Sequence, residues 1–123
     1  MMILAITFLS GCEEPVWAES FITEASYYTY TSCIKEGTSG ICANGERMDD
    51  EALTAASWDY KFGTTLRVTN QCNGRSVLVR VNDRGPSKKL YRKGRKIDLS
   101  LKAAKELKMV KSGLATVLIE VVK

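Results

Sequence analysis

The sequence contains no histidine, and this absence removes several classes of mechanism. A Ser-His-Asp triad, a Cys-His nucleophilic pair and a His-bearing zinc site all need an imidazole. Three of the four cysteines, Cys33, Cys42 and Cys72, follow the first segment, and their spacing matches no CxxC metal pattern. The sequence therefore predicts neither a metal centre nor a cofactor, and carboxylates remain as candidates for acid–base chemistry.

A disulfide is the favoured interpretation of these three cysteines. Their number is odd, so one thiol stays free or pairs with a second chain. The pairs Cys33–Cys42, Cys42–Cys72 and Cys33–Cys72 all remain open at this stage.

Neither length nor charge sets this chain apart. Its 123 residues predict one domain, and its formal net charge of +4 is modest. Basic residues are dense only in residues 88–96, the run KKLYRKGRK. Such a run can bind a nucleic acid, an anionic polymer or a lipid surface, or it can form a solvated loop without a ligand. We favour the solvated loop.

The amino terminus resembles a bacterial lipoprotein signal. A short apolar run ends in Leu-Ser-Gly-Cys at Cys12, and such proteins are cut before the cysteine, whose sulfur carries a diacylglycerol. We therefore expect a signal peptide at 1–11, a lipidated tether at 12–23 and a folded domain at 24–123. By lipoprotein sorting logic, Glu13 after the cysteine predicts the outer membrane, so the domain would lie at its periplasmic face.

The signal lacks one usual feature, because no Lys or Arg precedes Cys12. We favour a shortened sequence, in which the true start of the protein lies upstream of Met1. The alternative is an accidental match, in which the run is an ordinary buried strand with a free cysteine.

The domain is expected to consist mostly of short strands. Aromatic and β-branched residues predict strands at 26–31 and 53–57. Two alternating segments, 65–69 and 75–81, flank Asn-Gly at 73–74, whose positive φ angles suit a tight hairpin.

Only one helix is convincing. Ser100 offers an N-cap to residues 101–108, where apolar residues recur at helical spacing. The nearly continuous apolar run at 114–122 predicts a buried closing strand. Short strands, one small helix and many glycine turns together favour a closed barrel.

Asp83 stands at the end of the alternating strand at 76–82. Gly85 and Pro86 follow it and stiffen the backbone, so this carboxylate can be aimed as an active-site acid is. The alternative is an ordinary turn residue that bonds its own backbone.

Five motifs in register resemble the rare lipoprotein A family across residues 25–122. They are Ala43-Asn44-Gly45-Glu46, Leu53-Thr54-Ala55-Ala56, Phe62-Gly63-Thr64, Asn82-Asp83-Arg84-Gly85-Pro86 and Ile97-Asp98-Leu99-Ser100. The resemblance implies a six-stranded double-psi β-barrel, related to the barrels of expansins and barwin-like proteins. It also implies a periplasmic lipoprotein that acts on peptidoglycan.

Active members of that family are lytic transglycosylases. They cleave glycan strands between N-acetylmuramic acid and N-acetylglucosamine, prefer strands without stem peptides, and leave a 1,6-anhydro end. One carboxylate can protonate the glycosidic oxygen and then accept the proton of the sugar's own 6-hydroxyl, so neither histidine nor an activated water is needed.

The resemblance carries the functional pair onto Glu46 and Asp83. We expect Asp83 to be the acid/base, while Glu46 orients the substrate, stabilises the oxocarbenium-like centre or raises the pKa of its neighbour. The two roles could be exchanged, and Glu46 could also be a solvated loop residue. Where the active members usually carry a histidine, this chain has Ser57, which cannot carry charge near neutral pH.

Further residues are candidates for substrate binding. Tyr28, Trp58 and Tyr91 offer faces that stack on pyranose rings, although core packing or scattered exposure is the commoner fate. Arg84 offers a bidentate ligand for a muramyl carboxylate, and its alternative is a structural ion pair in the turn, with Asp98 as one partner.

Two functions therefore remain open. The first is a monomeric peptidoglycan lytic transglycosylase attached to a membrane through Cys12. The second is a catalytically inactive, expansin-like lipoprotein that binds glycan or loosens the wall, which Ser57 favours. Nucleic-acid binding through residues 88–96 is not expected of a protein held outside the cytoplasm.

Overall fold

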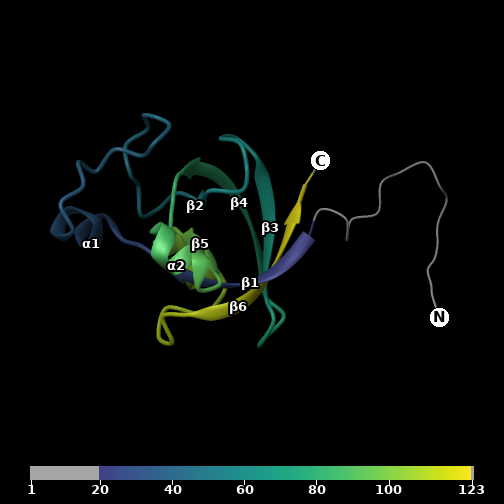
Figure 1. Cartoon of the computed structure of the whole chain (residues 1–123). Helices are drawn as coiled ribbons and strands as arrows, with labels where there is room; N and C mark the ends of the chain where they lie inside the picture. The colour runs from purple at the N-terminus through teal and green to yellow at the C-terminus, as the bar shows by residue number, and fades with distance from the viewer. Residues whose placement is uncertain (1–19, 123) are drawn as a thin grey trace, which may run out of the picture.

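Six strands close into a barrel in the computed structural model, which describes residues 20–122 (Figure 1). Around the barrel the strands follow the order β1-β5-β2-β4-β3-β6, in which β1 with β5 and β2 with β4 are parallel and the other neighbours are antiparallel. The strand bounds are β1 Ser20–Tyr27, β2 Thr54–Ser57, β3 Thr65–Asn70, β4 Ser76–Asp83, β5 Arg95–Leu99 and β6 Ala115–Val121. The closed six-stranded barrel expected from the sequence is confirmed.

The barrel interior is filled by alternate residues of its strands, as period-two side-chain placement requires. The fully buried members are Leu66, Val68, Val79, Val81, Ile97, Leu99, Val117 and Ile119. Helix α3 (Leu101–Glu106) adds Ala103 and Ala104 to this core, and Leu107 follows directly after the helix. The predicted alternation at 65–81 and the predicted closing strand near the carboxyl terminus are therefore confirmed, but in β6 only the alternate residues Val117 and Ile119 are buried.

The first strand begins earlier than the sequence indicated. Residues 20–22, which we assigned to a polar tether, belong to β1 and pair antiparallel with residues 118–120 of β6. The hydroxyl of Thr23 donates to the carbonyl of Gly94 at 2.8 Å, which ties the same stretch to the residue before β5. Only pairing with distant strands makes this stretch regular, so no local pattern revealed it.

The strand expected at 26–31 is wrong beyond Tyr27. Thr29 caps helix α1 (Tyr30–Lys35) instead, because its hydroxyl accepts from Ser32 N while Ser32 Oγ accepts from Thr29 N, both at 3.0 Å. This reciprocal capping box satisfies the first turn of the helix and outweighs the strand preference of the aromatic residues.

Two further elements lie in the basic run. Ser87 caps helix α2 (Lys88–Arg92), and β5 starts at Arg95 after Gly94, whose φ is +103°. The solvated loop favoured for residues 88–96 is therefore partly wrong. The described residues hold three short helices where one was expected.

The β3–β4 hairpin is confirmed, but its turn differs from the predicted one. Asn70 pairs with Arg75 across a four-residue loop, and within the loop only Gly74 adopts a positive φ, +77°. The side chain of Asn73 instead accepts from Arg75 N and donates to the carbonyl of Leu107. The tight two-residue reversal is thus replaced by a longer loop fastened to the end of α3.

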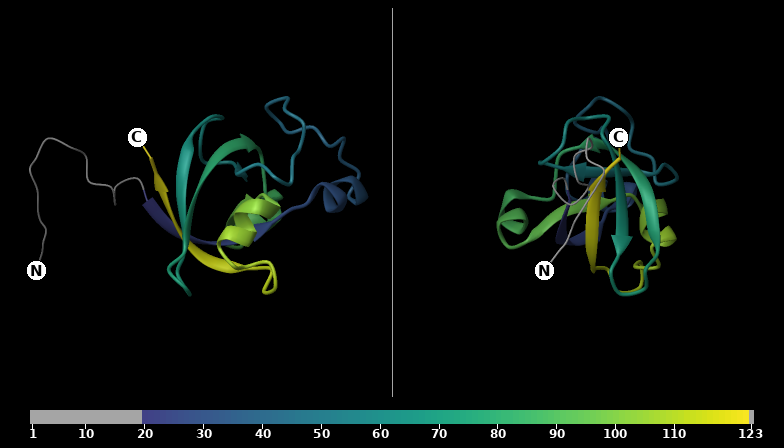
Figure 2. Two further views of the ribbon diagram at one scale, coloured as in Figure 1. Left: turned by 180° about the vertical axis from the view of Figure 1, so that it is seen from behind. Right: turned by 90° about the vertical axis from the view of Figure 1, so that its right-hand side faces the viewer.

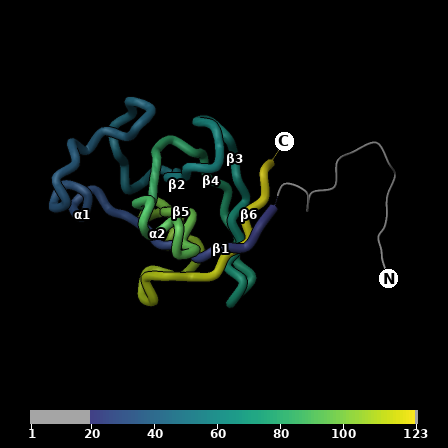
Figure 3. Tube along the Cα trace, viewed as in Figure 1, coloured from purple at the N-terminus to yellow at the C-terminus, as the bar shows by residue number. Residues whose placement is uncertain are grey.

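Figure 2 shows the barrel from behind and from the side, and Figure 3 traces its path. In these views α1 and the long loop that follows it project from one end of the barrel, and the carboxyl-terminal end of β6 lies toward the other. Within residues 20–122 no helix is long and apolar enough to cross a bilayer.

Candidate active site

Glu46 is presented by a tight turn in the long loop. Gly45 N donates to Cys42 O at 2.9 Å, Cys42 N donates to Glu46 O at 2.7 Å, and Glu46 N donates to Asn44 Oδ1 at 3.0 Å. Gly45 has a φ of +95°, which a residue with a Cβ rarely adopts. The sequence Ala-Asn-Gly-Glu therefore sets the direction in which the carboxylate leaves the loop.

The carboxylate of Glu46 is held by two side chains of β4. Asn82 Nδ2 donates to Oε1 at 3.0 Å, and Arg80 Nη1 lies 3.1 Å from Oε1 and 2.9 Å from Oε2. The bond from Asn82 and then that from Arg80 keep the pKa of Glu46 below its usual value. Glu46 is therefore an ionised group on an exposed rim.

Asp83 ends β4 beside this turn. Its Oδ1 accepts from Ala43 N at 2.9 Å and from Arg84 N at 2.8 Å, and Asn44 N donates to the carbonyl of Asn82 at 3.2 Å. The loop of Glu46 is thus bonded to the end of the strand that carries Asp83. The structure brings the two predicted carboxylates to one rim of the barrel.

The negative charges of Asp83 and Glu46 both act on the thiol of Cys42. Cys42 is buried, and burial is the largest cause that raises its pKa to about 11. Asp83 and Glu46 each raise it further. Cys42 is therefore a protonated thiol at neutral pH, and it supplies neither a nucleophile nor a metal ligand.

Asp98 is a third carboxyl group at this rim, to which the sequence assigned no catalytic part. Ile97 and Leu99 point into the core, so Asp98 on β5 points the other way, where its Oδ1 accepts from the hydroxyl of Ser26. Burial raises the pKa of Asp98, and the charge of Asp83 adds to this. The alternation Ile-Asp-Leu before Ser100 is the signal that could have identified it.

Gly85, in the turn that follows Asp83, lies close to Asp98 and to Ala56 of β2. A Cβ on Gly85 would lie 3.4 Å from the Cβ of Ala56 and 3.7 Å from Asp98 Oδ2. The turn after Asp83 therefore packs directly over β2 and β5.

Ser57 ends β2 and is buried, with 1% of its surface exposed. Its hydroxyl accepts from Asp59 N at 3.0 Å, so it shapes the loop that follows. The position where the resemblance implies a histidine thus holds a small side chain bonded to its own loop.

Arg84 turns toward backbone carbonyls. Its Nη1 donates to Ser57 O at 2.8 Å and to Tyr60 O at 3.1 Å, and its guanidinium carbon lies 3.9 Å above the ring centroid of Phe62. These contacts join the turn of Asp83 to the loop after β2. No ion pair between Arg84 and Asp98 occurs within residues 20–122.

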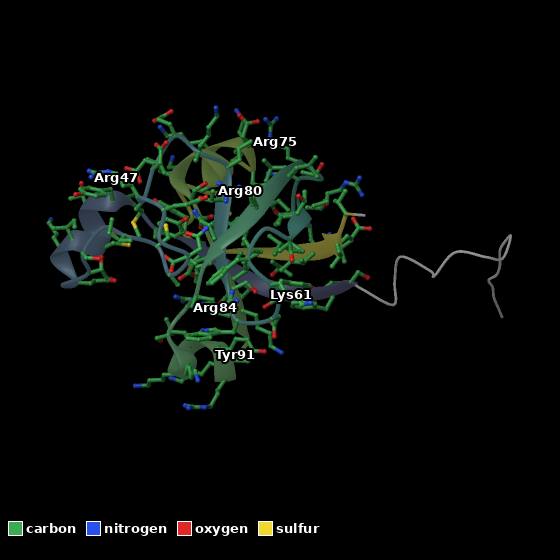
Figure 4. The ribbon with its side chains drawn as sticks, turned by 90° about the horizontal axis from the view of Figure 1, so that it is seen from above. Arg47, Lys61, Arg75, Arg80, Arg84 and Tyr91 are labelled. Atoms are coloured by element: carbon green, nitrogen blue, oxygen red, sulfur yellow. The ribbon has the colours of Figure 1, made fainter. Side chains whose placement is uncertain are left out.

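The aromatic candidates lie in different surroundings. The hydroxyl of Tyr28 lies 3.1 Å from Thr54 Oγ1, and its pKa is raised, chiefly by burial. Trp58 is 40% exposed, and its Nε1 donates to Pro86 O at 2.6 Å. The hydroxyl of Tyr91 donates to Asp59 Oδ1 at 2.6 Å. Figure 4 shows Arg80, Arg84 and Tyr91 in succession from β4 to α2.

Cys33, Cys42 and Cys72 are free thiols, so the described part of the chain contains none of the disulfides expected from the sequence. They belong to separate elements, namely α1, the long loop and the β3–β4 loop. Among residues 20–122 no group of three His, Cys, Asp or Glu side chains could hold a metal ion. Cys12 and the predicted signal lie outside the described residues.

The family model described as "Lytic transglycolase" matches residues 22–119. "Probable endolytic peptidoglycan transglycosylase RlpA" of Nostoc sp. is 57% identical over 79 residues, which are 64% of this chain and 20% of that protein. "Endolytic peptidoglycan transglycosylase RlpA" of Campylobacter jejuni is 39% identical over 113 residues, 82% of this chain and 40% of the relative. The chain thus spans less than half the length of these two relatives.

Solved structures share the barrel at lower identity. A Streptomyces papain inhibitor has a TM-score of 0.63 and 23% identity over 90% of this chain and 100% of its own. The expansin of Clavibacter michiganensis has a TM-score of 0.61 and 20% identity over 85% of this chain and 50% of its own. A variant of that expansin, solved with cellohexaose, has a TM-score of 0.61 and 18% identity over the same shares of the two chains. The double-psi β-barrel expected from the sequence is therefore confirmed.

Proposed function

Because this chain belongs to the lytic transglycolase family, we propose that its barrel is a peptidoglycan lytic transglycosylase. Its substrate is the glycan strand between N-acetylmuramic acid and N-acetylglucosamine, preferably without stem peptides, and its product ends in 1,6-anhydro-N-acetylmuramic acid. The observation that carries this proposal is the hydrogen-bonded rim on which Glu46 and Asp83 meet.

The proposed chemistry needs one proton donor and one anion. Asp83 protonates the glycosidic oxygen as the bond from C1 to that oxygen breaks, and it then takes the proton of the 6-hydroxyl as that oxygen bonds to C1. Glu46 is the anion, since its lowered pKa makes it a poor donor and suits it to stabilise positive charge at C1. The lowered pKa of Glu46 therefore favours Asp83 as the acid/base and disfavours an exchange of the two roles.

Asp98 lies next to the turn that follows Asp83. Its pKa is raised, chiefly by burial, so a further negative charge beside the turn of Asp83 is disfavoured. We assign it a positioning role.

The test is incubation of the purified chain with peptide-free peptidoglycan, followed by mass analysis for 1,6-anhydro ends. We expect these ends with the wild type and their loss, at least a hundredfold, in Asp83→Asn and Glu46→Gln. Asparagine keeps an oxygen for the two backbone donors, so the fold should survive, which circular dichroism checks. Glu51→Gln, an exposed change outside the rim, is the matched control and should keep full activity. A wild type that pellets with the peptidoglycan but yields no such ends would refute the enzymatic proposal.

That outcome would favour a second function, an inactive protein that binds glycan or loosens the wall. The contacts of Ser57 favour it, because a buried hydroxyl bonded to Asp59 N provides no charge to the rim. The two functions differ in product formation and agree in binding.

We further propose that the chain is a monomer lipidated at Cys12 and held at the periplasmic face of the outer membrane. The Leu-Ser-Gly-Cys sequence before Glu13 supports this. In a diderm bacterial host, we expect labelled palmitate to enter the wild type and not Cys12→Ser. Equal labelling of both would refute the anchor.

A further inference from the structure

A hollow of about 430 Å³ borders the turn that follows Asp83, because Trp58 in its wall donates to Pro86 O. Its walls come from the loop after β2 and from helix α2, and they comprise Trp58, Asp59, Lys88, Tyr91 and Arg92. Trp58 directly follows Ser57, and α2 starts five residues after Asp83 in the sequence, at Lys88. The two segments that form the hollow therefore follow shortly after β2 and β4, the strands that end at the rim.

The two rings in this hollow are held in place. Trp58 Nε1 donates to Pro86 O, in the turn that follows Asp83, and the hydroxyl of Tyr91 donates to Asp59 Oδ1. These bonds join α2, the loop after β2 and the Asp83 turn. Rings fixed in this way lose little freedom when a sugar stacks on them.

Cations outnumber carboxylates around the rings, where Lys88, Arg92 and Lys96 face the single carboxylate of Asp59. Lys88 Nζ lies 4.8 Å from the ring centroid of Trp58, and Lys96 Nζ lies 5.0 Å from that of Tyr91. Neither lysine nor Arg92 forms a salt bridge within residues 20–122. The nearby carboxylate, Asp59, is engaged by the hydroxyl of Tyr91.

Arg84 was the sequence's candidate for a sugar carboxylate, but its Nη1 is engaged with backbone carbonyls. Lys88 and Arg92 of α2 line the hollow and are exposed to solvent. Lys88 lies over one face of the Trp58 ring, and neither it nor Arg92 forms a salt bridge within residues 20–122. Cations beside fixed rings are complementary to a sugar ring that bears a carboxylate.

We propose that this hollow is a second glycan subsite, which takes a pyranose carrying a free carboxylate. Within the substrate proposed above, on which this inference rests, that sugar is a muramyl residue whose lactyl group has lost its stem peptide. Loss of the peptide turns an amide into an anion beside the ring. Trp58 stacks on the sugar, while Lys88 and Arg92 bind the anion, so the hollow gives a physical reason for a preference for peptide-free strands.

The test measures binding by calorimetry in the full chain, with Asp83→Asn present to prevent turnover. The probes are peptide-free glycan oligosaccharides with free lactyl carboxylates, the same oligosaccharides with those groups converted to methylamides, and chitooligosaccharides of equal length. We expect Lys88→Ala/Arg92→Ala to weaken binding of the carboxylate probe at least tenfold, because both cations that bind the anion are removed. Binding of the two neutral probes should change little.

The matched control is Lys89→Ala/Lys93→Ala, which removes the same charge from the same segment without touching the hollow. It should leave the carboxylate preference intact. Equal weakening by both double variants, or equal binding of carboxylate and methylamide probes by the parent, would overturn the subsite. Binding of a short DNA duplex as tight as that of the carboxylate probe would also overturn it, since it would indicate a general polyanion surface.

This inference and the proposed function can fail separately. A chain that prefers the carboxylate probe through Lys88 and Arg92 but forms no 1,6-anhydro ends would keep the subsite and lose the enzyme. A chain that forms these ends but binds all probes equally well would keep the enzymatic activity and lose the subsite.

Discussion

Glu46 and Asp98 are carboxyl groups near one turn whose surroundings move their pKa values in opposite directions. Donors from Asn82 and Arg80 stabilise the charged form of Glu46, while burial disfavours the charged form of Asp98. Residue type alone does not distinguish them. Their roles follow from which neighbours the barrel places around each.

The acid side of the activity profile should report Glu46. Since its pKa is lowered from the ordinary 4.5, activity should persist as pH falls to that value and decline only below it. Arg80→Met removes one of the donors and should move this decline to higher pH. Arg67→Met is the matched control, because Arg67 pairs with Glu120 on β6. Identical profiles for wild type and Arg80→Met would contradict the assigned role.

Asp98→Asn should stabilise the protein at neutral pH. Below the ordinary pKa of 3.8 the carboxyl is protonated in both the folded and the unfolded state, so it contributes no difference. As pH rises through that value the unfolded chain ionises first, and the folded state loses stability until its own raised pKa is passed. The asparagine avoids this loss, so we expect it to raise the free energy of unfolding at pH 7 and the difference to disappear near pH 3.5.

Urea unfolding at both pH values measures the effect of Asp98→Asn. Asp49→Asn, at an exposed loop position, should show no comparable dependence on pH. A wild type that gains stability relative to Asp98→Asn as pH rises would contradict the burial argument.

At the scale of elements, the short helices depend on their caps. Helices of five or six residues are too short to form by propensity alone, and each begins at a Ser or Thr whose side chain accepts from the first turn. These caps also set the loops that frame the rim. Thr29 caps α1 two residues after β1 ends, and Ser87 caps α2, the helix that contains Lys88 and Arg92.

Ser100→Ala should be the costliest cap removal. Ser100 is fully buried, and its hydroxyl donates to Ala52 O at 2.7 Å while accepting from Ala103 N and Thr54 N, both at 3.3 Å. Losing it removes the cap of α3 and leaves buried groups unpaired, so we expect a loss of about 2 kcal/mol in the free energy of unfolding.

Ser87→Ala is the matched control for this prediction. Ser87 is an exposed cap, and its loss should cost only about 0.5 kcal/mol. Chemical denaturation measures both variants. Equal costs would show that the buried bonds of Ser100 add nothing.

At the scale of the whole molecule, β1 closes the barrel, because it pairs with β5 on one side and with β6 on the other. Its first residues carry much of that closure. Ser20 to Thr23 pair with residues 117–120, and Thr23 Oγ1 also accepts from Lys96 N at 3.1 Å.

A chain that starts at Glu24 should therefore be strongly destabilised, whereas one that starts at Ser20 should keep a cooperative thermal transition. Removing the segment leaves one edge of β6 unpaired and exposes part of the core. Differential scanning calorimetry of the two truncated chains measures this. Equal transition temperatures would place the domain boundary at 24, where the sequence suggested it.

The sequence by itself determined the strands whose burial alternates, the cap at Ser100 and, through motif resemblance, the barrel with Glu46 and Asp83. Alternation and caps are local signals that neighbouring residues carry. Only the tertiary structure decided the start of β1, the strand hidden behind the basic run and the separation of Arg84 from the cations of α2. It also decided the opposite pKa shifts of Asp98 and Glu46, because desolvation and hydrogen bonding depend on groups that are far apart in the chain and meet only when the barrel closes.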